Sequence, residues 1–135
     1  MATELSKPRG AFPHLREHGG IVYVSGTSAR QPDNSIAGAA ADDLGTVSLD
    51  MSVQATAVLD NIESVLTIVG LNRSDILDAT VFLVNMNDFG AYNAAWAAFF
   101  EGVPAPARTT IAVHQLPHPH LLIEIKATAA KRGED

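Results

Sequence analysis

The clearest pattern in the chain is a helical repeat of apolar residues in its middle third. Apolar positions recur there every three or four residues and so share one helix face: Met51, Ala55, Val58, Leu59, Ile62, Val65, Leu66 and Val69. Ser48 or Asp50 is suited to cap the start of this helix, and Gly70 suits its end. A second helix is predicted after Asp88, because the next aromatic residues fall on one side: Phe89, Tyr92, Trp96, Phe99 and Phe100.

Shorter apolar runs, rich in β-branched residues and bounded by glycine or proline, predict strands. The segment from 27 to 45 mixes Pro, Asp, Asn and Gly and is typical of a loop, with a short strand around Ile36. The expected strands are Ile21–Val24, Ile76–Val84, Arg108–Leu116 and Leu121–Ala129.

The resulting order is strand, loop, helix, strand, helix, strand, strand. It favours an α+β fold in which two helices cover one face of a mixed sheet. Since the strands are apolar on both sides, we expect the open face to drive self-association. The 135 residues are the size of one domain, with residues 1–9 and 131–135 expected to be loose termini.

Composition narrows the function classes. The chain has no cysteine, which excludes disulfides, thiolate metal ligands and a thiol nucleophile. Its formal net charge of -6 argues against nucleic acid as a partner, because such binding needs clustered Lys and Arg. No signal peptide and no apolar run long enough to span a bilayer is visible, so we expect a cytoplasmic protein without membrane contact.

Two charged residues stand inside the last strand-like runs. Arg108 offers a planar fork for a carboxylate, and a partly buried Glu124 could have its pKa raised and act as a base and an acid. On the residues alone, a cross-strand ion pair between them is the commoner explanation.

Other candidates are weaker when taken one at a time. Ser25 and Gly26 could present backbone groups to a ligand, although a plain turn is the commoner reading. Asn93 could bind a ligand or simply face solvent. His118-Pro119-His120 has the spacing of some metal ligands, but no further ligand supports a metal site, and a stiff loop explains the prolines better.

Taken together, these positions resemble the RidA/YjgF family of reactive intermediate imine deaminases over nearly the whole chain. The resemblance rests on these blocks: Ile21–Gly26, Asp60–Ile62, Ala79–Phe82, Asn87–Phe89, Tyr92–Asn93, Phe99–Phe100, Pro106–Arg108 and Ile123–Ile125. It implies a chorismate-mutase-like protomer and a homotrimer whose sheets form a central barrel, with sites between subunits and no cofactor or metal.

The resemblance also implies roles for residues. Arg108 would bind the substrate carboxylate, and Glu124 would position or activate a water. Further substrate contacts would come from Asn93 and from Ser25, Gly26, Thr109 and Thr110. His14 stands where many members have a tyrosine, and the segments 25–34 and 114–127 look like those of the 2-aminomuconate deaminase branch.

The expected function is therefore hydrolytic release of ammonia from 2-aminomuconate to give 4-oxalocrotonate, in degradation of aromatic compounds. The second carboxylate of that substrate needs a second cation, for which we expect Arg30. His14, His118, Arg16 and His114 are competitors. The alternatives are a broad 2-imino acid deaminase and a non-catalytic trimer that binds small acids.

Overall fold

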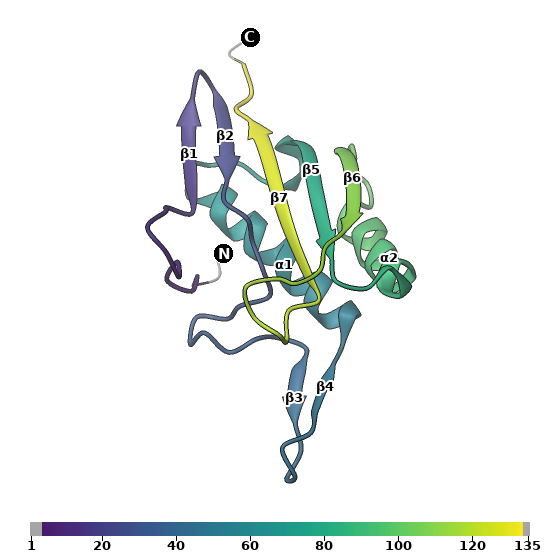
Figure 1. Ribbon diagram of the computed structural model, residues 1–135. Coiled ribbons are helices and arrows are strands. Elements are labelled where there is room, and N and C mark those ends of the chain that lie inside the picture. The colour runs from purple at the N-terminus through teal and green to yellow at the C-terminus, as the bar shows by residue number, and fades with distance from the viewer. Residues whose placement is uncertain (1–3, 134–135) are drawn as a thin grey trace.

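The computed structural model describes residues 4–133, which form one layer of sheet with two helices packed on one of its faces (Figure 1). The α-helices are α1 (Met51–Thr67) and α2 (Phe89–Phe99), and 3₁₀ turns occupy Arg73–Asp75 and Met86–Asp88. The strands are β1 (Leu15–His18), β2 (Ile21–Val24), β3 (Ala39–Ala41), β4 (Val47–Leu49), β5 (Ile76–Leu83), β6 (Ala107–Ala112) and β7 (Ile123–Ala130). Among the described residues, no helix is long and apolar enough to cross a membrane.

The main sheet has the strand order β1-β2-β7-β5-β6. Strand β5 pairs with β6 in parallel, and the other neighbours are antiparallel, so the sheet is mixed. The predicted α+β class, with two helices on one face of a mixed sheet, is confirmed. The order also places β5 between β6, which carries Arg108, and β7, which carries Glu124.

Both ends of α1 follow from local chemistry. The Asp50 side chain accepts a hydrogen bond from the Val53 N–H at 3.1 Å, so Asp50 caps the helix. At the other end the Leu71 N–H donates to Leu66 and the Gly70 N–H donates to Thr67. This closure needs a left-handed residue, and Gly70 has a φ of 75°.

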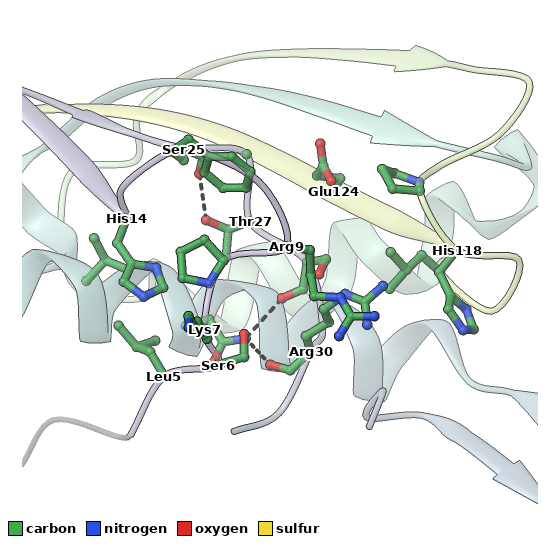
Figure 2. Close-up of a pocket in the computed structure, with 18 residues that line it drawn as sticks. Leu5, Ser6, Lys7, Arg9, His14, Ser25, Thr27, Arg30, His118 and Glu124 are labelled. Carbon is green, nitrogen blue, oxygen red and sulfur yellow. Dashed lines mark hydrogen bonds between the residues drawn. The ribbon is translucent and has the colours of Figure 1, made fainter. Parts of the chain in front are cut away.

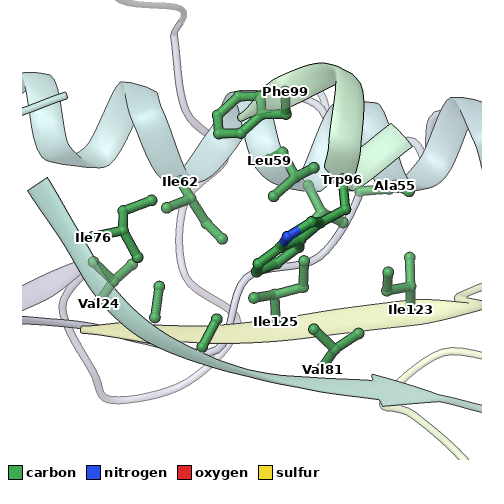
Figure 3. Close-up of a cluster of buried hydrophobic side chains, with 14 of the residues drawn as sticks. Val24, Ala55, Leu59, Ile62, Ile76, Val81, Trp96, Phe99, Ile123 and Ile125 are labelled. Carbon is green, nitrogen blue, oxygen red and sulfur yellow. The ribbon is translucent and has the colours of Figure 1, made fainter. Parts of the chain in front are cut away.

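The core lies between the helices and the sheet (Figure 3). The predicted apolar stripe of α1 is buried, apart from Val69, which is only partly so. Four of the five aromatic residues of the second helical segment are buried, and Phe89 is the exposed exception. Asp88 directly precedes α2 as predicted, but its side chain makes no capping hydrogen bond.

The segment expected to be a loop contains a hairpin that the sequence pattern missed. Strands β3 and β4 form a separate two-stranded sheet that projects from the body of the molecule (Figure 1). Its strands are only three residues each, three alanines in β3 and Val-Ser-Leu in β4, which is too short for a period of apolar residues to show. At Ile36 there is an isolated bridge to Arg30 rather than a strand.

Two other expectations differ from the structure. The strand expected to reach Leu116 ends at Ala112, and the next begins at Ile123 rather than Leu121, because a loop containing Pro117 and Pro119 lies between them. In the tail, Lys131 pairs with Glu17 and Arg132 donates two hydrogen bonds to Asp75. Residues 1–3 and 134–135 lie outside the described part.

The face of the sheet away from the helices is mixed in character rather than uniformly apolar. Tyr23 and Ile111 are exposed there, but Lys126 and Thr128 alternate with the buried residues of β7. Self-association through this face stays a prediction.

Candidate functional site

Glu124 lines a cavity of about 430 Å³, to which the N-terminal segment, the loop after β2, α1 and the loop before β7 also contribute (Figure 2). The volume lies within the range of sites for small molecules. Among the residues that the structure describes, Glu124 is the only acidic one in the lining, whereas five basic side chains contribute to it: Lys7, Arg9, His14, Arg30 and His118. The cavity is therefore suited to an anionic ligand.

Glu124 itself is half-buried and makes no hydrogen bond or ion pair with the described residues. Burial raises the pKa of its carboxyl group, and no neighbouring cation offsets that effect. Gly26 lies directly against it, because a Cβ placed on Gly26 would be 2.8 Å from Glu124 Oε2. A carboxyl group with a raised pKa at the wall of a cavity is suited to taking up and returning a proton.

The loop that follows β2 is held in place by backbone and side-chain hydrogen bonds. The Ser25 N–H donates to the His14 C=O at 2.9 Å, and Ser25 Oγ donates to the Pro13 C=O at 2.7 Å. Further along the loop, Asn61 of α1 donates to the backbone C=O groups of Ser28 and Arg30. These bonds bring four predicted site residues into the cavity of Glu124: Ser25, Gly26, His14 and Arg30.

The loop with His118 is fixed from the same helix. Gln54 is fully buried, donates to the His120 C=O at 2.7 Å and accepts from the Leu122 N–H at 2.9 Å. The His120 N–H in turn donates to His118 Nδ1 at 3.0 Å. Within the described part of the chain no three His, Asp or Glu residues gather as metal ligands would. The hydrogen bonds of Gln54 and His118 hold the loop that carries the two histidines.

Arg108 lies elsewhere in the same subunit. It pairs with Ala79 of β5, whose side chain is buried on the side of the sheet that faces the helices. Glu124 pairs instead with Phe82 of β5, whose side chain is on the other side of the sheet. Because side chains alternate along strands, Arg108 and Glu124 belong to opposite faces of the sheet. The alternative of a cross-strand ion pair between them is wrong for one subunit, since β5 separates their strands.

A second cluster surrounds Arg108. Its Nη1 donates to Asn93 Oδ1 at 2.9 Å, and its guanidinium group lies 5.0 Å from the Trp96 ring centroid and 5.1 Å from that of Tyr92. Tyr92 Oη is 2.7 Å from Thr110 Oγ1. Arg108 has no carboxylate partner among the described residues, so its remaining N–H groups can receive one from a ligand. Thr109 lies on the other face and is exposed.

The structure thus divides the predicted site residues between two places. Glu124, Ser25, Gly26, His14 and Arg30 share the cavity, and the second cluster contains Arg108, Asn93 and Thr110. Of the competing cations, His118 lines the cavity, whereas Arg16 and His114 do not.

Sequence reasoning missed Lys7 and Arg9. The segment 1–9 was expected to be loose, and the only hint was two basic residues in an otherwise acidic chain.

A family model described as Endoribonuclease L-PSP matches residues 3–131. The 2-iminobutanoate/2-iminopropanoate deaminase of Escherichia coli is 39% identical over 136 residues, which cover 98% of this chain and 97% of that protein.

Two solved structures from the same organism share the fold. The crystal structure of the YjgF gene product has a TM-score of 0.80 at 31% identity, and covers 97% of each chain. That of TdcF with bound serine has a TM-score of 0.77 at 26% identity, covering 97% of this chain and 94% of TdcF.

Proposed function

Because the chain belongs to the Endoribonuclease L-PSP family, which is the RidA/YjgF family of the sequence resemblance, we propose that it is a cofactor-independent 2-imino acid deaminase. The observation that carries the proposal is Glu124, a half-buried carboxyl group without a partner among the described residues, in a cavity to which five basic side chains also contribute. The name of the Escherichia coli relative supports small 2-imino acids as substrates. A nuclease activity has little support in a chain with a net charge of -6.

The proposed reaction converts a protonated 2-imino acid and water into a 2-oxo acid and ammonium. The water oxygen bonds to the imine carbon while Glu124 takes a water proton, and the C=N electron pair moves to nitrogen. Glu124 then returns the proton to the amino group. The C–N bond breaks as the C=O bond forms, and the departing ammonia takes up the hydroxyl proton. A carboxyl group with a raised pKa suits both proton transfers, because it gains and loses a proton nearer neutral pH.

Arg108 completes this site only if two subunits meet. Its guanidinium group is suited to hold the substrate carboxylate, yet in one subunit it lies on the opposite face of the sheet from Glu124. Strand β6 is an edge strand, so Arg108 is near a border that a second subunit could reach. This separation supports the expected homotrimer with sites between subunits.

A second candidate is 2-aminomuconate, the substrate that the sequence resemblance favoured. The observation in its favour is that Arg30 lines the cavity of Glu124, where a cation for a second carboxylate is needed. The named Escherichia coli relative points instead to small 2-imino acids, which are therefore the main proposal.

Ammonia release from 2-iminopropanoate and from freshly generated 2-aminomuconate tests the two candidates. We expect turnover of 2-iminopropanoate. Faster turnover of 2-aminomuconate would make 2-aminomuconate the preferred substrate of the two. Arg30→Ala should then raise the Michaelis constant for 2-aminomuconate alone. If neither substrate releases ammonia, the alternative of a non-catalytic protein that binds small acids would be favoured.

Gly26→Ala should lower kcat by about 10- to 100-fold, since a misplacement of about 1 Å at a reacting group has effects of that size. The added Cβ would meet Glu124 Oε2 at 2.8 Å and Cδ at 3.3 Å, so the carboxyl group must move. The matched control is Gly90→Ala in α2, where a Cβ meets nothing within 4 Å and activity should be unchanged. Equal rates for both variants would show that the position of the Glu124 carboxyl group is not critical.

A further inference from the structure

Three basic side chains from three distant segments reach toward the same part of the cavity: Arg9, Arg30 and His118 (Figure 2). Arg30 and Arg9 both contribute to lowering the pKa of His118, after burial and His120, so all three groups interact electrostatically. Among residues 4–133, neither arginine has an ion pair, and Glu124 is the only acid in the lining. An uncompensated positive cluster in an acidic chain calls for an anionic ligand.

Two of these groups are fixed by one helix. Asn61 holds the backbone of Arg30, and Gln54 holds the loop of His118 through His120 and Leu122. Residues 54 and 61 are two helical turns apart and share a face of α1, so one rigid element positions both groups. Such prior ordering reduces the entropy lost when a ligand binds.

His118 is also fixed as a donor. Its Nδ1 accepts the His120 N–H, so in the neutral ring the proton is on Nε2. The lowered pKa of His118 favours that neutral form near pH 7. The imidazole therefore adds one N–H to those of the two guanidinium groups.

We propose that Arg9, Arg30 and His118 form an anion-binding subsite, separate from Arg108, which selects small acids carrying a second anionic group. The ligand class is a linear dicarboxylate, with one carboxylate at Arg108 of a neighbouring subunit and the other at this subsite. Arg9 brings the N-terminal segment over the cavity as part of the same contact. The choice of a dicarboxylate rests on the second candidate of the proposed function, 2-aminomuconate, whereas the subsite itself rests on the three basic groups and the hydrogen bonds that hold them.

Isothermal calorimetry of the full-length protein with two stable acids tests the subsite. Muconate (hexa-2,4-dienedioate) has two carboxylates, and sorbate (hexa-2,4-dienoate) has the same diene with one. A charge-assisted contact is worth about 1.5–3 kcal/mol, which corresponds to about 10- to 100-fold in affinity. We therefore expect muconate to bind at least about 10-fold more tightly than sorbate.

Single variants locate that preference. Arg9→Gln, Arg30→Gln and His118→Phe should each weaken muconate binding by about 10-fold or more while changing sorbate binding by less than about twofold. His118→Gln keeps an N–H near the position of Nε2 and should retain more affinity than His118→Phe. Lys131→Gln removes a positive charge at the end of β7, outside the cavity, and should change neither affinity.

Equal affinities for muconate and sorbate in the wild-type protein would overturn the subsite. An equal loss of muconate affinity in Lys131→Gln and in Arg30→Gln would overturn it too. Deamination of 2-iminopropanoate without any preference for muconate would reject the subsite and leave the proposed function standing. A muconate preference that depends on these three residues, in a protein that deaminates no imine, would support the subsite and reject the proposed function.

Discussion

Replacing Glu124 by glutamine is expected to lower kcat for ammonia release from 2-iminopropanoate by about 10²- to 10⁴-fold, the usual contribution of a positioned acid or base. Glutamine has nearly the same shape but neither takes up nor returns a proton. The side chain has no partner among the described residues, so its replacement breaks no hydrogen bond there. Steady-state ammonia assays check the rate, and circular dichroism checks the fold. Retention of most activity would assign the proton transfers to another group.

The pH dependence gives a second measure of the same residue. Burial raises the pKa of Glu124 above its ordinary 4.5, so the carboxyl group stays protonated to a higher pH than a free glutamate. If its carboxylate is the base, kcat/KM should fall on the acid side with an apparent pKa above 4.5. If kcat/KM falls on the acid side with an apparent pKa of 4.5 or lower, another group controls the rate.

Stability should change in the opposite direction to activity. A raised folded-state pKa means that the stability contribution of Glu124 is present below its unfolded pKa and is lost as pH rises through the folded one. At pH 7 the buried carboxylate therefore costs stability. Glu124→Gln should therefore raise the free energy of unfolding at pH 7, and by less at pH 4, where the carboxyl group is largely protonated. Urea unfolding at the two pH values measures the difference.

Replacing Arg108 by glutamine is expected to lower kcat/KM for 2-iminopropanoate by about 30- to 1,000-fold, because a charge-assisted grip on a carboxylate is worth about 2–4 kcal/mol. Most of the change should be in KM if Arg108 only binds, and in kcat as well if it also orients the imine beside the water. Lys131→Gln is the control for loss of one positive charge. Unchanged kinetics would remove Arg108 from the site.

Mixing the two inactive variants asks whether Arg108 and Glu124 act in one site across subunits. Each is still intact in one of the two mutant chains, so a site built from neighbouring chains can contain both. In a trimer assembled at random from equal amounts, about one quarter of the sites would be intact. Co-expression of Arg108→Gln and Glu124→Gln should therefore restore about one quarter of wild-type activity. No recovery in mixed trimers would mean that both groups must come from one chain.

The local features of the fold could be predicted because they depend on neighbours in the chain. The apolar period of 51–69, a cap at Ser48 or Asp50 and a C-terminal closure at Gly70 are written in short segments. The structure confirms a helix over Met51–Thr67, capped by Asp50 and followed by a left-handed Gly70. The β3–β4 hairpin was missed because strands of three residues are too short to show an apolar period. The end of β6 and the start of β7 differ from the predicted bounds because Gln54 holds the loop between them in place. Gln54 is 66 to 68 residues away in the chain, so a short segment of sequence does not reveal this contact.

The amino-acid pattern was enough to predict the α+β class, the two helices and the two unusual charged residues, Arg108 and Glu124. How those residues are grouped became clear from the three-dimensional arrangement alone. Strand order places β5 between them and alternation turns them to opposite faces, whereas Arg9, Arg30 and His118 meet in the cavity of Glu124. The physical reason is that periodicity fixes which side of its own element a residue takes. Pairing between distant strands and loops fixes which residues share a space.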